Sequence, residues 1–207
     1  LNRIPHNWII WGVIGANAVV FTLWGMSETE MKNRRPQFQQ WMLNNFTVSW
    51  QNLSAGRFWT VITSAFSQMD FMHALFNGLT FYWMAPATLS ALGGARFTYL
   101  YLSGALRALA CSGATLYFNP HIASLGASGA VYSIIATFAC MFPRTTFYLF
   151  GIAPLPAWAF VGGILAWDGY NAWQVSQRTA TPPGGSKTNY IGHVGGVLTG
   201  IAYYLLR

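Results

Sequence analysis

The sequence predicts an all-α integral membrane protein, a single domain over residues 1–207 built as a polytopic bundle of six transmembrane helices. Hydrophobic residues make up 54% of the chain and charged residues only 7%, which is too little polar surface to cover a soluble domain of this length. Six mostly apolar segments are each long enough to cross the core of a bilayer as a helix, which takes roughly 20 residues.

The basic residues favour membrane lipids as partners and not nucleic acid. The net charge is +7, but most lysines and arginines are scattered singly, as expected at loop ends that face anionic headgroups. Only Lys32, Arg34 and Arg35 form a cluster. The two cysteines lack the spacing of a metal site or a disulfide framework, so we expect no metal and no cofactor.

The first two predicted spans are joined by a segment that we expect at the membrane surface. The first helix runs from about Trp8 to Trp24, and the second runs from about Phe71 to Leu92 with a kink at Pro86. The connection between them is rich in aromatic side chains, which are typical of headgroup depth. These aromatic residues are Trp41, Phe46, Trp50, Phe58 and Trp59.

The remaining spans are bounded by turns that contain glycine or proline. A tight turn at residues 93–96 leads into the third helix, and Pro143 ends the fourth. The polar connection at residues 168–189 is a candidate lid. The four predicted helices cover residues 97–118, 128–142, 147–167 and 190–206.

Ser128 has the surroundings of a nucleophile. It lies between Gly126 and Gly129 at a predicted helix start, where free backbone N–H groups point outward and neighbouring side chains leave room around a hydroxyl. Those N–H groups also suit a developing oxyanion. The alternative is an N-cap serine beside glycines used for close packing.

His193 is a costly side chain to place in a membrane helix, which favours a functional role. Gly192, Gly196 and Gly200 recur at four-residue spacing, so this helix can approach a neighbour almost backbone to backbone. If that neighbour is the helix of Ser128, imidazole and hydroxyl come within the hydrogen-bond reach that general-base activation requires. The alternative is a structural bridge between helices.

Three further side chains are candidates for supporting this pair. His73 and Asn77 are four residues apart and share a helix face, where they offer two donors in the same direction. Tyr132 follows Ser128 by four residues and is placed to contact an imidazole ring. The alternatives are a hydrogen-bonded pair between helices for His73 and Asn77, and simple packing for Tyr132.

We expect no acidic residue in the site. The four acids lie at loops or at the ends of the predicted spans, so the arrangement is expected to be a Ser-His dyad that packing orients, unlike the Ser-His-Asp triad of soluble proteases. These acids are Glu28, Glu30, Asp70 and Asp168.

In this order, the motifs resemble those of the rhomboid intramembrane serine proteases over essentially the whole chain. The matching patterns are HxxxN at His73 and Asn77, GxSG at residues 126–129, and HxxGxxxG beginning at His193. The resemblance implies substrates that are single-pass transmembrane proteins, cut within or near the bilayer where their helix unwinds.

The resemblance also implies roles for these residues. Ser128 would be the nucleophile and His193 the base, with Tyr132 against the imidazole. His73, Asn77 and the backbone amide of Ser128 would form the oxyanion site.

Two segments look most like the mitochondrial presenilin-associated rhomboid-like branch, namely residues 125–130 and 166–168. This likeness implies the mitochondrial inner membrane. The first loop departs from bacterial members, because Thr60 follows Trp59 in place of arginine and Gln68 stands where histidine is frequent. The sequence leaves open whether a targeting segment or a further helix precedes residue 1.

Two other functions fit parts of the pattern. Intramembrane histidine and asparagine side chains also line solute paths in transporters, but the sequence has no inverted repeat. A catalytically inactive rhomboid-like protein that binds membrane clients would not need both Ser128 and His193. Arg107, in the middle of the third predicted span, is expected to face a polar interior or a helix end.

Overall fold

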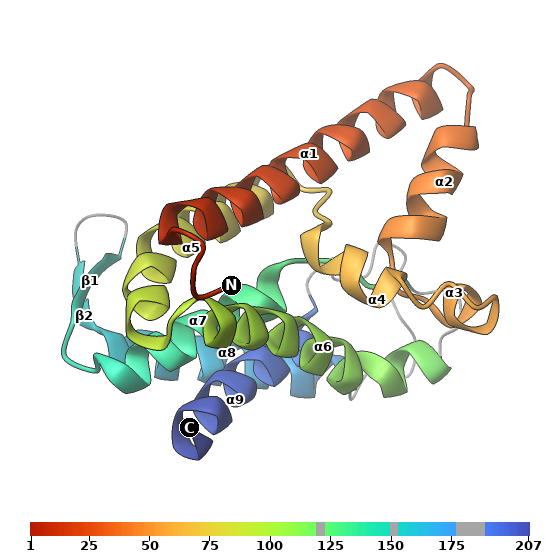
Figure 1. The fold of residues 1–207 in the computed structure, drawn as a ribbon. Coiled ribbons are helices and arrows are strands. Elements are labelled where there is room, and N and C mark those ends of the chain that lie inside the picture. The colour runs from red at the N-terminus through yellow and green to blue at the C-terminus, as the bar shows by residue number, and fades with distance from the viewer. Residues whose placement is uncertain (119–122, 150–152, 177–188) are drawn as a thin grey trace.

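The structure is a computed structural model that describes residues 1–118, 123–149, 153–176 and 189–207 (Figure 1). These residues form helices and one pair of strands. The helices are α1 (His6–Lys32), α2 (Gln37–Phe46), α3 (Trp50–Ser54), α4 (Thr60–Thr63), η1 (Ser64–Phe66), α5 (Phe71–Leu92), α6 (Gly94–Phe118), α7 (Ser128–Met141), α8 (Ala157–Ser176) and α9 (Tyr190–Leu206). The strands are β1 (Thr146–Leu149) and β2 (Ala153–Pro156).

The six longest apolar helices follow the order of the predicted spans: α1, α5, α6, α7, α8 and α9. α5 and α9 have the predicted bounds because a polar side chain caps each of them. Asp70 accepts a hydrogen bond of 2.8 Å from the backbone N–H of His73, and Asn189 accepts one of 2.9 Å from Gly192. The expected turn between α5 and α6 is shorter than predicted, because Gly93 alone, with φ of 77°, breaks the helix.

Among the described helices, α1 meets both the length and the apolarity expected of a membrane span, whereas α7 and α9 are apolar but have only 14 and 17 residues. Large apolar side chains nevertheless cover much of the outer surface. Trp8 is 72% exposed, Trp83 73% and Leu205 71%. A surface of this kind suits contact with lipid.

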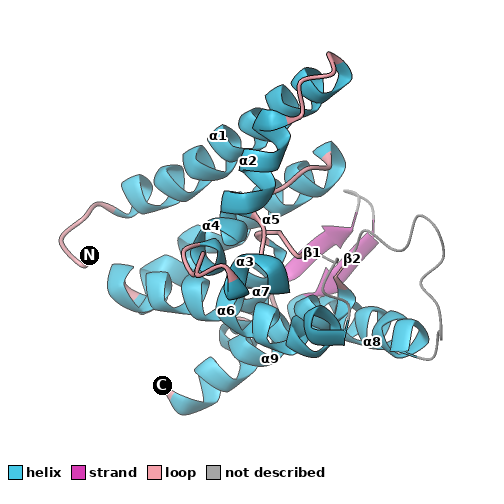
Figure 2. Cartoon of the chain, turned by 90° about the vertical axis from the view of Figure 1, so that its right-hand side faces the viewer, coloured by secondary structure: helices cyan, strands magenta, loops and turns pink. Residues whose placement is uncertain are grey.

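A hairpin stands where the fifth helix was expected to begin, so the all-α prediction needs correction (Figure 2). β1 and β2 pair antiparallel with Thr146 opposite Pro156. Pro154 and Pro156 lack a backbone N–H, and a proline ring disfavours helical geometry in the residue before it. The helix therefore begins only at Ala157.

The end of the fifth helix was also predicted wrongly. α8 continues past Trp167 to Ser176, so Asp168 lies inside a helix and not in the polar connection. The rest of the predicted lid, residues 177–188, lies outside the described residues.

The predicted interfacial segment forms the short elements α2, α3, α4 and η1. The side chains of Trp50 and Phe58 are exposed, as expected for a segment at headgroup depth. Trp24 of α1 is buried against Met42 of α2, and its indole Nε1 donates a 2.5 Å hydrogen bond to the Ser67 hydroxyl. These contacts hold η1 against α1. η1 also contacts the loop before α7, because the Ser64 carbonyl accepts a hydrogen bond from the N–H of Gly126.

α7 is the innermost helix. Eleven of its fourteen residues are buried, and it packs against α5, α6, α8 and α9. Small residues make this possible, since a Cβ added at Gly129 would overlap the Ala108 side chain of α6. The functional candidates on α5, α7, α8 and α9 thus surround a common core.

Candidate active site

Backbone hydrogen bonds hold the loop that precedes Ser128. Val48 and Ser124 exchange two of them, of 2.8 and 2.7 Å, as an isolated antiparallel bridge. The N–H of Gly126 donates to the Ser64 carbonyl at 3.0 Å. Ser128 then begins α7, and no side chain caps this helix. The Ser128 hydroxyl therefore lies at a helix end whose first N–H groups are not taken by a capping side chain.

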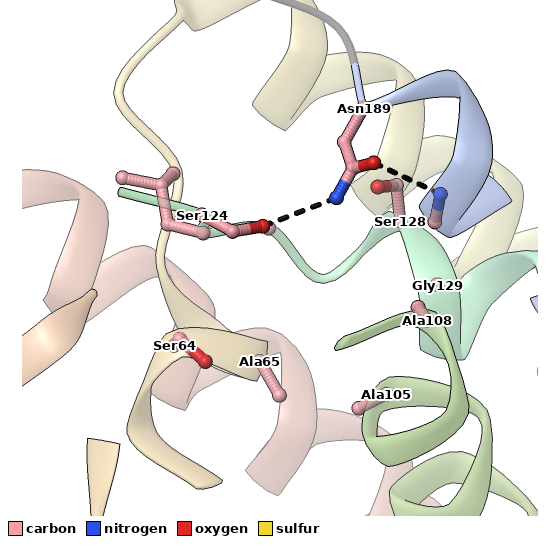
Figure 3. A pocket seen from close by; sticks show the side chains of 11 residues that line it. Ser64, Ala65, Ala105, Ala108, Ser124, Ser128, Gly129 and Asn189 are labelled. Carbon is pink, nitrogen blue, oxygen red and sulfur yellow. Dashed lines mark hydrogen bonds between the residues drawn. The ribbon is translucent and has the colours of Figure 1, made fainter. Parts of the chain in front are cut away.

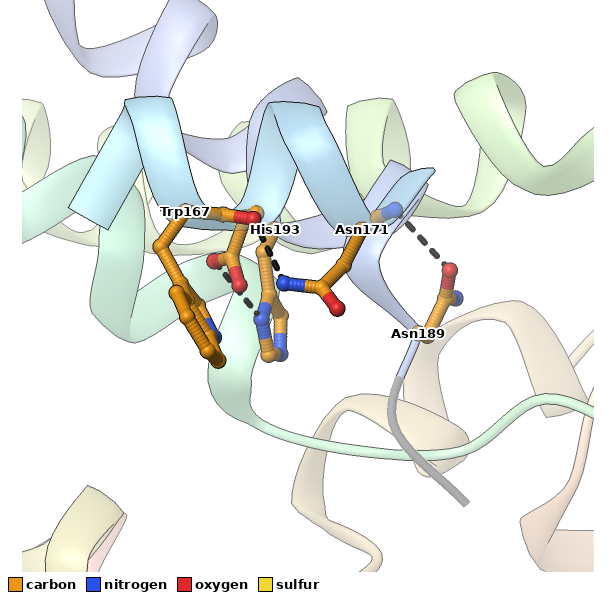
Figure 4. A network of polar contacts seen from close by, with 6 residues as sticks. Trp167, Asn171, Asn189 and His193 are labelled. Carbon is orange, nitrogen blue, oxygen red and sulfur yellow. Dashed lines mark hydrogen bonds and ion pairs between the residues drawn. The ribbon is translucent and has the colours of Figure 1, made fainter. Parts of the chain in front are cut away.

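The imidazole of His193 is buried and held from two sides. Its ring stacks on Tyr132 of α7 with 4.2 Å between centroids and 26° between planes. Its Nδ1 lies 3.1 Å from Oδ2 of Asp168 on α8. Figure 4 shows His193 beside the turn of α8 that carries Trp167 and Asn171. The other ring nitrogen, Nε2, is buried and has no hydrogen-bond partner among the described residues.

α7 and α9 touch at their backbones where the glycine spacing predicts it. A Cβ added at Gly196 would lie 2.5 Å from the carbonyl oxygen of Gly129, and one at Gly200 would overlap the carbonyl oxygen of Ser133. At Gly192 the nearest atoms to an added Cβ belong to the Asn189 side chain, at 2.7 Å. The small size of Gly192 thus accommodates the helix cap, and its predicted role in helix packing stays a prediction.

The hydrogen bond predicted between Ser128 and His193 is not formed, because Nε2 of His193 has no hydrogen-bond partner in the part of the chain that the structure describes. Tyr132 and Asp168 fix the plane of the ring. Ser128 and His193 nevertheless lie at the same end of the contact between α7 and α9. Gly129 of α7 touches Gly196 of α9. Ser128 directly precedes Gly129, and His193 lies about one turn before Gly196. Hydrogen bonds of catalytic pairs are often long until substrate binds.

A small pocket adjoins Ser128 (Figure 3). Its volume is about 20 Å³, enough for one water molecule. Ser64, Ser124 and Asn189 supply polar atoms to its lining. The Asn189 amide donates a 3.1 Å hydrogen bond to the Ser124 hydroxyl and so ties the start of α9 to the loop before Ser128.

His73 and Asn77 of α5 have different surroundings. The His73 ring lies 6.4 Å from the His193 ring, measured between centroids. Asn77 is buried and donates a 2.8 Å hydrogen bond to Oε1 of Gln68, whose own amide donates to Asn17 at 3.3 Å. One N–H of the Asn77 amide is thereby used, which leaves the second for another acceptor. This chain of amides borders a mostly apolar cavity of about 210 Å³ between α1, α5 and α7.

Three of these side chains, Asn189, Asp168 and Gln68, were not expected in the site from the sequence. Asn189, just before an apolar helical segment, carried the ordinary signal of a helix N-cap. Asp168 and Gln68 reach the site only through contacts distant in sequence, which no local pattern reports. Arg107 is exposed near the middle of α6, so the interior or helix-end position expected for it is wrong.

The sequence matches the Rhomboid domain model over residues 55–207, a region that contains both Ser128 and His193. The match covers most of the chain and includes every helix from α4 to α9.

Named relatives agree with this match. The chain is 32% identical to RHOMBOID-like protein 12, mitochondrial, of Arabidopsis thaliana in an alignment of 170 residues that covers 72% of this chain and 46% of that protein. It is 29% identical to Rhomboid protein 1, mitochondrial, of Saccharomyces cerevisiae over 206 residues, 96% of this chain and 53% of that protein. It is 28% identical to Presenilin-associated rhomboid-like protein, mitochondrial, of Mus musculus over 196 residues, 93% of this chain and 46% of that protein.

The chain spans about half the length of these relatives, and other matching relatives have chloroplastic names. The domain match and the relatives lead to one conclusion: this chain belongs to the rhomboid family.

Proposed function

We propose that this rhomboid is an intramembrane serine endopeptidase that cleaves single-pass transmembrane proteins within or near the bilayer. The strongest support comes from the surroundings of the His193 imidazole. Its ring is held by Tyr132 and Asp168, yet its buried Nε2 has no partner among the described residues. A buried polar atom without a partner costs free energy, and such atoms concentrate at functional sites. A general base needs such an unoccupied lone pair.

The proposed reaction uses the contact between α7 and α9. Oγ of Ser128 attacks the peptide carbonyl while Nε2 of His193 accepts its proton and later gives that proton to the leaving amine. The Ser128 N–H, His73 and the second N–H of Asn77 stabilise the oxyanion. Removing one such donor typically costs ~3 kcal/mol of transition-state stabilisation. Water then hydrolyses the acyl-enzyme.

The substrate class follows from the chemistry of a helical peptide bond. Such a bond is shielded by its own helix and must become extended before a hydroxyl can attack it. Substrates with helix-breaking residues near the cut are therefore favoured. The mitochondrial names of several relatives support a mitochondrial location, and the resemblance to the presenilin-associated rhomboid-like branch favours the inner membrane.

Cleavage in liposomes tests this function. We expect the purified chain to cut a single-pass model substrate that has glycine or proline within its membrane segment, and mass spectrometry to place the cut beside those residues. Replacing them with alanine and leucine stabilises the substrate helix and is expected to slow cleavage about tenfold or more, which corresponds to about 1.4 kcal/mol. Failure to cut either substrate contradicts the proposal, as does equal cleavage of both.

The backbone at Gly126 gives a separate prediction. Gly126 has φ of 141°, where side chains are strained, and an added Cβ would lie 3.4 Å from Oγ of Ser128. We expect Gly126→Ala to slow cleavage by about 10- to 100-fold, since strain of roughly 1–3 kcal/mol shifts the loop that carries Ser128. The matched control is Gly56→Ala, at φ of 76° with no atom within 4 Å. Equal losses in both variants would show that Gly126 has no special relation to Ser128.

A further inference from the structure

Asp168 is the only buried acid of this chain. All four acidic residues are described, and Asp168 is 4% exposed while Glu28 and Asp70 are exposed and Glu30 is half-buried. An ionised carboxylate in such a position loses its hydration, so it requires a partner that donates hydrogen bonds or carries positive charge.

His193 is that partner. Oδ2 of Asp168 lies 3.1 Å from Nδ1 of His193, and each side chain is only 6% exposed. No lysine or arginine among the described residues forms an ion pair with Asp168. The other titratable groups around the ring are His73 of α5 and Tyr132 of α7, the second of which also interacts with Asp168. An ionised carboxylate only accepts hydrogen bonds, so this contact favours the neutral ring that carries its hydrogen on Nδ1.

We propose that Asp168 is a positioning residue that selects this tautomer of His193 and stabilises its charged form, an inference that rests on the proposed function. With the hydrogen on Nδ1, the lone pair of the ring lies on Nε2. The proton of Ser128 Oγ moves to Nε2 as the Oγ–C bond forms, and it leaves on the amine as the C–N bond breaks. Asp168 stays ionised throughout and faces the imidazolium.

This arrangement corrects the dyad expected from the sequence. Asp168 of α8 contacts His193 of α9, and Ser128 begins α7, which packs against α9. A purely structural tie between α8 and α9 is the competing role for Asp168. The Asp168→Asn substitution separates the two roles, because it keeps the size and an acceptor oxygen while it removes the charge.

Kinetics in liposomes with the model substrate provide the first test. We expect Asp168→Asn to lower kcat about 100-fold or more, with KM changed by less than about twofold and an unchanged Tm. Asp168→Glu restores the carboxylate and is expected to regain about tenfold of that loss. Glu28→Gln removes an exposed acid of α1 and is the matched control, with wild-type kcat. Wild-type kcat in Asp168→Asn overturns the inference.

Nitrogen NMR of protein with isotope-labelled histidine provides the second test, independent of activity. We expect neutral His193 to carry its hydrogen on Nδ1 in the wild type and to populate both tautomers in Asp168→Asn. A wild-type hydrogen on Nε2 overturns the inference even if every variant folds poorly. A wild type that has the expected tautomer but cuts no substrate contradicts the proposed function and leaves the positioning of His193 by Asp168 supported.

Discussion

Ser128→Ala is expected to lower the rate of substrate cleavage by about 10⁴-fold or more, and His193→Ala by a similar factor. The reason is that nucleophile and base act as one unit: a hydroxyl without a base is a weak nucleophile, and a base without a hydroxyl has no proton to accept. The Ser128→Ala/His193→Ala double variant is therefore expected to be no slower than either single variant. The measurement is single-turnover cleavage of the model substrate in liposomes.

The controls separate chemistry from folding. Ser128→Ala removes one hydroxyl, so its thermal unfolding in detergent should stay close to that of the wild type. His193→Ala leaves the buried carboxylate of Asp168 without its partner, so we expect a lower Tm and measure its cleavage at a temperature where this variant is folded. Additive losses in the double variant would mean that Ser128 and His193 act independently. Residual cleavage at the wild-type rate in Ser128→Ala would exclude this serine as the nucleophile.

Gly196→Ala is expected to damage both stability and activity. The added Cβ would lie 2.5 Å from the carbonyl oxygen of Gly129 and 3.1 Å from its Cα, and backbone atoms cannot move aside as a flexible side chain can. Overpacking of this kind costs about 1–3 kcal/mol of unfolding free energy. For a chain of this size, we expect Tm to fall by roughly 5–10 °C. Since α9 would move away from α7, His193 would also move away from Ser128, and we expect cleavage to fall about 100-fold or more.

Gly163→Ala is the matched control for this substitution. Gly163 lies within α8, and an added Cβ there meets no atom within 4 Å. We expect its Tm and cleavage rate to match the wild type. If Gly196→Ala behaves in the same way, the close approach of α7 and α9 does not position the site.

Local patterns were sufficient to predict the helices that carry His73, Asn77 and His193. α5 and α9 begin at capping side chains, Asp70 and Asn189, which are visible in the sequence as polar residues before apolar segments. The glycine pattern at Gly196 predicted a close helix contact, which is present, and Ser128 begins α7 as predicted.

The bounds of the fifth helix and the contact between Asp168 and His193 were not predicted, because they depend on features that the local distribution of apolar residues does not contain. The prediction ended the fifth helix where apolar residues gave way to Asp168 and Gly169, but helix formation depends on backbone hydrogen bonds and continues through polar residues to Ser176. That helix begins later than predicted because Pro154 and Pro156 disfavour helical geometry in the residues before them. Placed in a loop, Asp168 could not be assigned to His193, which lies 25 residues further along the chain.

The polar partner of Asn77 was missed for a related reason. The Gln68 and Asn77 amides come from two sides of the α5 start, and their hydrogen bond depends on how η1 and the following residues turn into that helix. Sequence spacing placed His73 and Asn77 on one face, and it contained no information on which acceptor the Asn77 amide would meet.

Labelling with a fluorophosphonate probe tests most directly whether His193 activates Ser128. The probe reacts covalently with activated serine hydroxyls, and it requires neither a substrate nor a cleavage site. We expect the wild type to be labelled on Ser128, identified by mass spectrometry of the modified peptide, and labelling to be lost in both Ser128→Ala and His193→Ala. Undiminished labelling of Ser128 in His193→Ala, or no labelling of a folded wild type, would contradict the proposed pairing of these two residues.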